Sequence, residues 1–317
     1  MKIKSIQLYE TRARTSQKSI WFYLWQDKWL YAMVLPAILY YFIFKYVPMY
    51  GLVIAFKDFN VFKGISGSAW NGLDNFRKVF STELFWLATR NTLLLNVSTL
   101  LVSFPLTILV SLMLNEVRSK MFRKVSQSFL YLPHFISWVV VAGIATNLFA
   151  QTDGSINNML AHMGLNRVPF LNENNWWIFT YVITNVWKEI GWGTIIYLAA
   201  ITGIDESLYE AAYIDGATKF QRIVYVTLPM IKSVIIVMLI LSISKMMSIG
   251  LDAPLLLGNT KVINVSEVLS TYIYRLGILK AQYSLSTVIG LFQSVVNIII
   301  LLLADRFAKL IGEEGII

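Results

Sequence analysis

Residues 205–229 read DESLYEAAYIDGATKFQRIVYVTLP and separate two long apolar runs of the chain. Asp205 is placed to cap a short helix, because its side chain can accept a hydrogen bond from the first turn. Gly216 can adopt the left-handed conformation that ends such a helix. A second short helix is expected over about 219–226, and Pro229 suits the first turn of the apolar run that follows. The stretch therefore predicts a compact helix–turn–helix with small residues at its corner.

The residue types alone leave two interpretations of this helix–turn–helix. Leu208, Ala211, Ala212 and Ile214 give it a narrow apolar face, and its small corner residues would let a partner backbone approach closely. An amphipathic loop lying on the bilayer surface would carry the same pattern.

The chain on either side of this stretch is apolar and poor in charge. Of its 317 residues 56% are hydrophobic and 14% charged, and it has no Cys. Because a soluble domain carries about 25% charged residues, this composition disfavours a soluble enzyme, a disordered chain and a disulfide scaffold. Six apolar runs reach the roughly 20 residues that a spanning helix needs. They cover about 30–56, 90–114, 127–150, 177–201, 233–257 and 284–304. The sequence therefore predicts an all-α integral membrane protein with six transmembrane helices.

The distribution of Lys and Arg predicts the orientation of these spans. The N-terminal segment, the tail and the loops after the second and fourth runs hold 15 of these residues, against 8 in the other three loops. Because Lys and Arg are enriched in cytoplasmic loops, both termini are expected in the cytoplasm. Residues 1–29 are then a cytoplasmic segment, residues 30–317 the transmembrane domain, and residues 202–232 a cytoplasmic loop. A net charge of +9 in so apolar a chain favours such loops over a nucleic-acid partner.

Within the loop 202–232, the order of residues resembles the EAA loop of ABC-importer permeases. That pattern is EAA, three residues, Gly, nine residues, Ile, one residue and Leu-Pro. The chain matches it at Glu210-Ala211-Ala212, Gly216 and Leu228-Pro229, with Val226 in place of Ile. This spacing identifies the chain as a member of the permease group.

The resemblance extends over nearly the whole chain. Segments 187–192 and 196–200 are similar to the carbohydrate-uptake group of these permeases. Segments 271–275 and 290–292 are similar to its LplB-type branch, which carries oligosaccharides derived from polymers. The resemblance implies a type I ABC-importer permease fold in a multi-pass protein of the bacterial cytoplasmic membrane. Such a permease forms half of the path for an oligosaccharide.

In such importers the EAA loop is a coupling helix that docks into a groove on a separate ATPase subunit. The implied ATPase-coupling residues are Tyr209, Glu210, Ala211, Ala212, Asp215, Gly216, Leu228 and Pro229. The implied partners are a second and different permease, two ATPase subunits, an extracytoplasmic solute-binding protein and membrane lipid.

Neither a nucleotide site nor a catalytic site is expected in this chain. It has no Gly-x4-Gly-Lys-Ser/Thr phosphate loop, so the permease is not expected to be an enzyme. ATP and Mg are expected on the partner ATPase subunits, and no cofactor on this chain. His134 and His162 are isolated in the sequence and do not suggest a metal site. No nucleophile and base stand at catalytic spacing.

Polar residues near the middle of three runs are candidates for the sugar path, because charge is costly at mid-bilayer. Glu189 and Lys245 can form a structural ion pair across two helices, or one of them can line a wet cavity and contact sugar. Aromatic neighbours can stack on sugar rings or pack in the bundle. The candidates are Trp187, Lys188, Glu189, Trp192, Tyr197, Lys245, Gln293 and Asn297.

Asp153, Asp252 and Glu267 fall in or near outer segments, where solvated loop charges or contacts of a binding protein are expected. Three other functions stay open: an ABC permease for a non-sugar solute, an ion-coupled secondary carrier and a membrane enzyme. A carrier is disfavoured because the sequence shows neither inverted repeats nor broken helices near an ion site. A membrane enzyme lacks a catalytic constellation.

Overall fold

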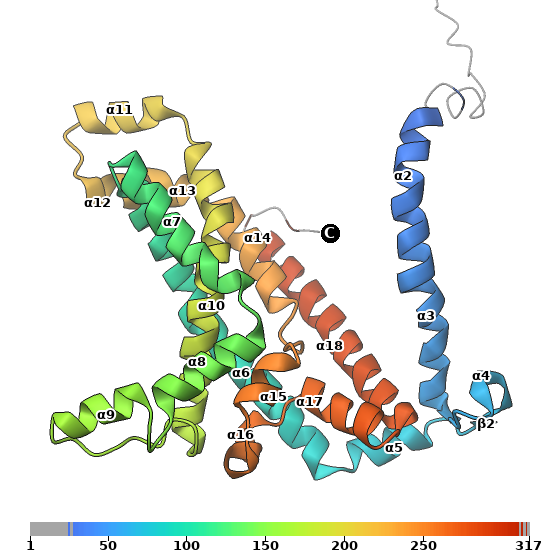
Figure 1. Cartoon of the computed structure of the whole chain (residues 1–317). Helices are drawn as coiled ribbons and strands as arrows, with labels where there is room; N and C mark the ends of the chain where they lie inside the picture. The colour runs from blue at the N-terminus through green and yellow to red at the C-terminus, as the bar shows by residue number, and fades with distance from the viewer. Residues whose placement is uncertain (1–24, 26–27, 311, 313–314, 316–317) are drawn as a thin grey trace, which may run out of the picture. The chain divides into compact units, whose positions relative to one another are not determined.

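A computed structural model describes residues 25, 28–310, 312 and 315, so most of the expected segment 1–29 lies outside the described residues (Figure 1). The described chain is mainly helical. Two short antiparallel strands, β1 (Lys57–Asp58) and β2 (Ala69–Trp70), flank α4 (Gly64–Gly67). The chain divides into two units, Met1–Leu52 and Val53–Ile317.

The first unit contains one helical run with an exposed apolar surface. Its elements are α2 (Lys28–Tyr41), η1 (Phe42–Tyr46) and α3 (Val47–Met49), and η2 (Tyr50–Phe56) follows. The run Lys28–Phe56 is long and apolar enough to cross a membrane, and no residue of α2 is buried. Such a surface is suited to a hydrocarbon environment.

Three long helices form the frame of the second unit: α6 (Glu83–Glu116), α10 (Asn174–Thr202) and α18 (Tyr283–Leu310). α10 packs along α6 and along α7 (Lys120–Phe135). A Cβ on Gly191 would overlap the carbonyl oxygen of Leu130 in α7. A Cβ on Gly193 would lie 2.8 Å from Cγ2 of Thr107 in α6. Two glycines in α10 therefore permit the close approach of these helices.

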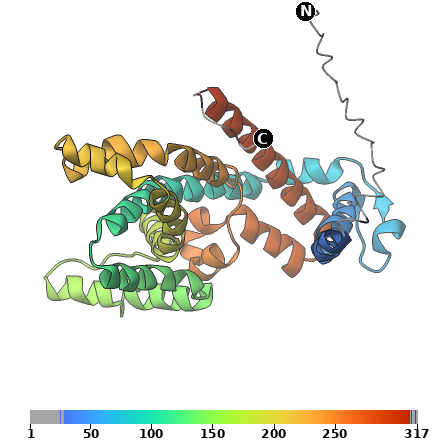
Figure 2. The same cartoon turned by 90° about the horizontal axis from the view of Figure 1, so that it is seen from above.

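Shorter helices complete the second unit. They are α5 (Asp74–Phe80), α8 (Trp138–Phe149), α9 (Ser155–His162), α11 (Glu206–Ile214), α12 (Lys219–Arg222), η3 (Ile223–Thr227), α13 (Leu228–Met230), α14 (Lys232–Ile243), α15 (Asp252–Leu257), η4 (Thr260–Val262), α16 (Ile263–Ser266), α17 (Leu269–Tyr274) and η5 (Arg275–Leu279). Figure 1 shows α11 at one end of this unit and α9, α16 and α5 at the opposite end. In Figure 2 the gold α11–α12 pair lies at the edge of the unit.

Two of the expected spans are interrupted, which corrects the expectation of one helix in each. The run 127–150 is divided between α7 and α8, which are bent by 103°. The run 233–257 leaves the helix after α14 and resumes at α15, so that residues 244–251 lie between helices. Apolar content does not reveal either break, because non-helical backbone can keep apolar side chains when other parts of the protein satisfy its polar groups.

Amide side chains from α6 and α18 satisfy the backbone of the second break. Asn96 Nδ2 donates to the carbonyl oxygen of Met246 at 2.7 Å. Asn297 Oδ1 accepts the N–H of Met247 at 3.0 Å, and Gln293 Nε2 donates to the Met247 carbonyl at 2.5 Å. These bonds replace the partners that a continuous helix would provide.

By length and composition, three helices in the described part of the chain are suited to cross a membrane. The number rises to five if each bent pair, α7 with α8 and α12–α13 with α14, forms one span. The helical class predicted from the sequence is confirmed, with the two-stranded hairpin as its exception.

Candidate functional site

The stretch 205–229 lies between α10 and α14 and begins with a capped helix. Asp205 is the N-cap of α11, and its carboxylate accepts the Ser207 N–H at 3.0 Å. This hydrogen bond holds the pKa of Asp205 below its usual range, because it favours the charged carboxylate. The predicted cap is confirmed.

The corner after α11 is a complete Schellman motif. The N–H of Ala217 donates to the Ala212 carbonyl at 2.9 Å, and the N–H of Gly216 donates to the Tyr213 carbonyl at 3.0 Å. Gly216 has φ +80°, the left-handed conformation predicted for it. In this motif the left-handed residue, here Gly216, lies four positions after the residue whose carbonyl accepts the hydrogen bond of the longer turn, here Ala212. This geometry explains the three residues between Ala212 and Gly216.

The returning limb of the loop is longer than the predicted helix 219–226. Thr218 and Gln221 form a capping box at its start. α12, the π-helical turn η3 and α13 then continue as one helical run to Met230, and Pro229 lies in the first turn of α13. The wide turn before Pro229 suits a residue that has no N–H to donate.

The two limbs of the loop are tied together and to the long helices. The Tyr209 hydroxyl lies 2.9 Å from the hydroxyl of buried Thr227. Leu228 packs against a small apolar cluster with members on α6 and α10, among them Leu112 and Ile201. These contacts hold the two limbs of the loop against each other and against α6 and α10.

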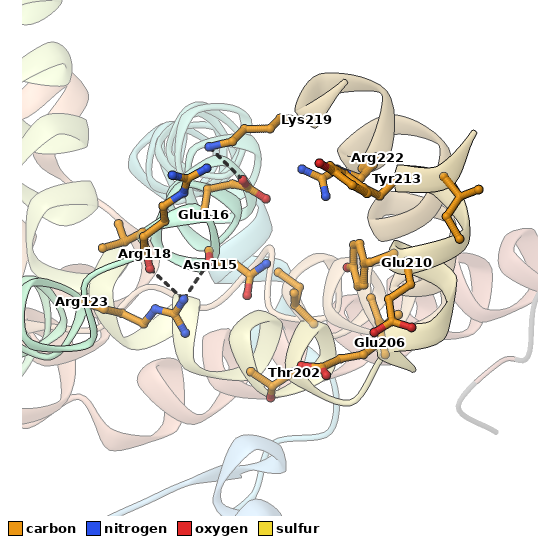
Figure 3. Close-up of a pocket in the computed structure, with 15 residues that line it drawn as sticks. Asn115, Glu116, Arg118, Arg123, Thr202, Glu206, Glu210, Tyr213, Lys219 and Arg222 are labelled. Atoms are coloured by element: carbon orange, nitrogen blue, oxygen red, sulfur yellow. Dashed lines mark hydrogen bonds and ion pairs between the residues drawn. The ribbon is translucent and has the colours of Figure 1, made fainter. Parts of the chain in front are cut away.

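A groove of about 1030 Å³ opens between α11 and the ends of α6 and α10 (Figure 3). Arg123 donates to the carbonyl oxygens of Asn115 and Val117, each at 2.9 Å, and so caps the end of α6. The Lys219 ammonium lies 3.7 Å from the Glu116 carboxylate and links α12 to the same helix end. Glu210 lines the groove from α11.

The corner of the loop carries exposed apolar side chains. No residue of α11 is buried, and Ile214 is 83% exposed. Tyr213, Phe220 and Tyr225 are between 73% and 75% exposed. Of these four side chains the sequence indicated only Ile214, on the apolar face of the helix. Tyr213, Phe220 and Tyr225 were missed, because periodicity assigns large apolar side chains to a buried face. The arrangement can offer a short helix with apolar side chains to a partner surface.

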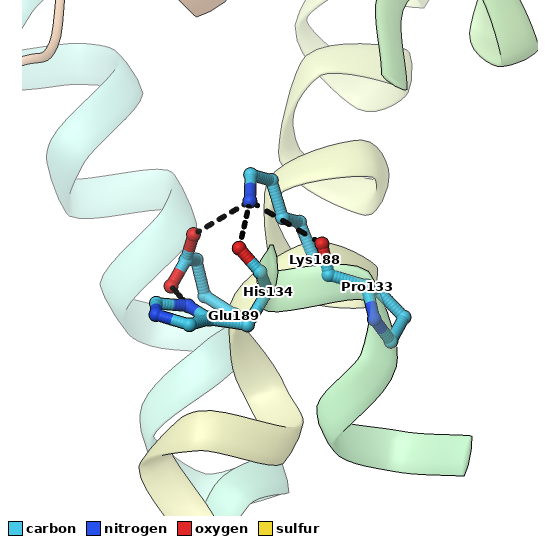
Figure 4. Close-up of polar contacts among 4 residues, drawn as sticks. All are labelled: Pro133, His134, Lys188 and Glu189. Carbon is cyan, nitrogen blue, oxygen red and sulfur yellow. Dashed lines mark hydrogen bonds and ion pairs between the residues drawn. The ribbon is translucent and has the colours of Figure 1, made fainter. Parts of the chain in front are cut away.

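A second polar cluster lies where α7 ends against the middle of α10 (Figure 4). Buried Lys188 donates from Nζ to the carbonyl oxygens of Pro133 at 3.3 Å and His134 at 2.6 Å. Glu189 Oε2 lies 2.7 Å from His134 Nδ1, and Glu189 Oε1 lies 3.7 Å from Lys188 Nζ. The His134 ring stacks on Trp192 with centroids 4.5 Å apart. Lys188 therefore caps the last carbonyls of α7 at its bend.

This cluster corrects two expectations. Glu189 contacts the His134 ring and forms an ion pair with Lys188, and the expected pair with Lys245 does not form. His134 is not isolated, because the end of α7 brings it beside α10. Within the described part of the chain, the exposed ammonium of Lys245 makes no hydrogen bond or ion pair.

The remaining candidates have different surroundings. Tyr197 is buried and meets Phe104 edge-on, with ring centroids 6.5 Å apart. Trp187 is exposed. Gln293 and Asn297 hold the break after α14, as described above. Among the described residues, no group of three or more His, Asp or Glu side chains could hold a metal ion.

The chain belongs to the family of binding-protein-dependent transport system inner membrane components, which it matches over residues 81–313. The resemblance to ABC-importer permeases is thereby confirmed, and the chain is a permease subunit of the inner membrane. The polygalacturonan/rhamnogalacturonan transport system permease protein YteP of Bacillus subtilis (strain 168) is 44% identical over 303 residues, which cover 96% of this chain and 94% of YteP. Protein LplB of the same organism is 41% identical over 291 residues, which cover 92% of each chain.

Two solved structures have the same fold. One is a bacterial ABC transporter involved in the import of the acidic polysaccharide alginate. A chain of it has a TM-score of 0.85 and 42% identity, covering 93% of this chain and 100% of that chain. The other is the alginate transporter in complex with a periplasmic protein that binds alginate pentasaccharide. It has a TM-score of 0.85 and 41% identity, covering 94% of this chain and 100% of that chain.

Proposed function

We propose that this permease forms half of the translocation path for an oligosaccharide delivered by an extracytoplasmic binding protein. The relatives support a sugar, since one is named for polygalacturonan and rhamnogalacturonan and another takes part in alginate import. A second, different permease and two ATPase subunits that hold ATP and Mg complete the proposed importer.

The loop 202–232 is the proposed coupling element, and the exposed apolar corner of α11 carries this proposal. A loop that only connected two spans would not need exposed aromatic and aliphatic side chains on a helix that is held in one conformation. Glu210 and Ala211 are exposed on α11, where they would contact the ATPase, and Ala212 is half-buried beside them. Asp215 and Gly216 form the corner. Tyr209, Leu228 and Pro229 would brace the loop against the spans.

Charge reversal at Glu210 tests the coupling role. In the importer reconstituted with its ATPase and loaded binding protein, Glu210→Lys is expected to abolish substrate-stimulated ATP hydrolysis while the permease still inserts and assembles. Glu173→Lys, at an exposed position before α10, is the matched control and is expected to keep the stimulation. Normal stimulation in Glu210→Lys would contradict the docking role.

The proposed topology has six spans with both termini in the cytoplasm, counting α10 as the fourth span. Because the chain has no Cys, single cysteines report sidedness without background labelling. Phe220→Cys in α12 and Phe62→Cys before α4 replace side chains that are 74% and 98% exposed. An impermeant thiol reagent outside the cell is expected to label only the cysteine at 62.

The sugar path is proposed to use the exposed members of the eight candidates. Trp187, Glu189, Trp192 and Lys245 would contact the sugar, because their side chains are accessible. Lys188, Tyr197, Gln293 and Asn297 would position the helices that carry them. Trp192→Ala is expected to raise the KM of uptake, and an unchanged KM would remove Trp192 from the path.

A further inference from the structure

A pocket of about 590 Å³ opens beside the first turns of α6, at the end of the second unit opposite α11 (Figure 1). Side chains of α6 line one side of it, and Asn264 of α16 lines the other. Neither the proposed coupling loop nor the proposed path uses these residues. The lining consists of Glu83, Leu84, Trp86, Leu87, Arg90 and Asn264.

Hydrogen bonds fix the two walls of this pocket to each other. Nδ2 of Asn91 donates to the carbonyl oxygens of Asn264 at 3.0 Å and Glu267 at 2.9 Å. Glu267 is only 2% exposed, so the expectation of a solvated loop charge there is wrong. The Leu269 N–H donates to Thr92 Oγ1 at 2.9 Å and holds the following turn against α6. The shape of the pocket is therefore set by contacts inside the chain.

The Trp86 ring is held in place and still has an accessible surface. Its Nε1 donates to the Phe80 carbonyl at 2.8 Å. Phe85 and Phe292 meet the ring edge-on, with centroids 5.0 Å and 6.5 Å away. Nevertheless, 52% of Trp86 is exposed. An indole fixed in this way can stack on the flat apolar face of a sugar ring without the entropy cost of ordering a mobile side chain.

Arg90 lies on the same side of α6 as Trp86, because residues four apart are neighbours on a helix surface. Its Nε and Nη2 donate to Asn91 Oδ1 at 3.2 Å and 2.9 Å, and Nη2 also donates to the Asn264 carbonyl at 3.0 Å. These bonds orient the guanidinium. Within the described part of the chain, Nη1 makes no hydrogen bond or ion pair. An exposed guanidinium with a free edge is suited to a carboxylate or a phosphate.

The order of side chains along α6 favours a ligand that combines an acid with a sugar ring. Glu83 precedes Arg90 by two turns, which is about 10 Å along the helix axis, and Trp86 lies between them. The Glu83 carboxylate repels an anion at its own end but accepts hydrogen bonds from hydroxyl groups. A uronate ring stacked on Trp86, with its carboxylate toward Arg90, satisfies all three side chains.

We infer that this pocket holds one uronate unit of an oligosaccharide, with its ring on Trp86 and its carboxylate on Arg90. The inference rests on the proposed function, which supplies the oligosaccharide and makes this end of the unit the outer one. It adds the acidic class of the sugar and a subsite outside the proposed path. The phosphate of an anionic lipid has the same charge but no ring for Trp86, and the experiment separates the two sources.

The test reads the pocket itself through a cysteine placed in its wall. The side chain of Asn264 is exposed and makes no hydrogen bond within the described residues, so Asn264→Cys keeps the carbonyl contacts of α16. The importer is assembled with its partner permease and ATPase subunits in phosphatidylcholine nanodiscs, without binding protein. The rate at which a maleimide labels the cysteine is followed by mass spectrometry of its peptide. The probes are trigalacturonic acid and its methyl ester, which keeps the rings and removes the charge.

The acid is expected to slow labelling, with a half-protecting concentration about fivefold below that of the ester, as for an ion pair that solvent can screen. Arg90→Gln is expected to make the two probes equal. Trp86→Ala is expected to weaken protection by both, and Trp86→Phe to restore it. Arg77→Gln, which removes a guanidinium that is 81% exposed on α5, is the matched control and is expected to change nothing. The cysteine of Lys261→Cys, outside the pocket on η4, is expected to label at the same rate with and without probe.

Several results would overturn the inference. They are no protection by the acid, equal protection by acid and ester, and an acid preference that Arg90→Gln retains. If phosphatidylglycerol in the nanodisc protects the cysteine without sugar, the occupant is a lipid phosphate. If Trp86→Ala does not assemble, Arg90→Gln decides alone. Uptake of oligosaccharide by the wild-type importer with its binding protein is measured separately. Uptake without protection removes only this subsite, whereas protection without uptake of any oligosaccharide removes the proposed function.

Discussion

Gly216 allows the geometry of the coupling loop to be tested separately from its contact surface. Its φ of +80° is one that L residues with a Cβ rarely adopt, and a Cβ there would meet no atom within 4 Å. Substitution therefore strains the backbone without a clash inside the chain. For Ala the left-handed conformation costs about 1–2 kcal/mol, which lowers the population of the native turn about 5- to 30-fold relative to alternatives. Asn tolerates this conformation better than Ala.

The assay is substrate-stimulated ATP hydrolysis by the reconstituted importer, measured with assembly of the complex. The expected order of stimulation is wild type, Gly216→Asn, Gly216→Ala and then Gly216→Val, because a β-branched residue suits the left-handed region least. If Gly216 were needed only to leave room for the ATPase, the smaller Ala would be better than Asn. Stimulation in Gly216→Ala equal to or above that in Gly216→Asn would refute the argument from the turn.

Three further predictions concern other parts of the chain. Gly191→Ala is expected to lower the melting temperature of the purified permease, because overpacking against the α7 backbone costs about 1–3 kcal/mol while the gain in helix propensity is about 1 kcal/mol. Gly203→Ala is the control, because its Cβ would lie 3.5 Å from its nearest neighbour. Equal melting temperatures of the two variants would contradict the packing argument. Lys245→Gln is expected to raise the KM for a uronate oligosaccharide more than for a neutral one, and equal effects in competitive uptake would remove the carboxylate contact. Because the folded-state pKa of Asp205 is lowered, the cap stabilises α11 at neutral pH and is lost as the pH falls through that pKa. The protection factors of the α11 amides, which are corrected for the intrinsic exchange rate at each pH, should therefore fall on acidification in wild type. Asp205→Asn, which caps without titrating, should not show this loss.

Local backbone chemistry explains why the coupling loop could be predicted. The cap at Asp205 and the turn at Gly216 each depend on residues within about five positions of one another. The long helices α6 and α18 could also be predicted from the sequence, because their apolar runs exceed the length of a span.

The candidate path depended on contacts that no local pattern encodes. His134 and Glu189 are 55 positions apart, and the packing of α7 against α10 brings their side chains together. Gln293 and Asn297 were predicted as candidates for the sugar path from their depth in the run, and no local pattern shows that they also bind the backbone of a break that apolar content had hidden. Glu267 is buried because residues of α6, far away in the sequence, hold its turn.

The break after α14 separates two tasks that a continuous helix would combine. Its main chain is held by amides of Asn96, Gln293 and Asn297, whereas the side chain of Lys245 is exposed and contributes nothing to those bonds. Solute preference could therefore diverge among descendants of this permease through changes at position 245, whereas Met247 is buried in the core and Ser248 is bonded to Gln293 and Asn297. A substitution library at the exposed positions 245 and 250, with Met247, Ser248 and the three amides kept, is a direct route to a transporter with a new cargo.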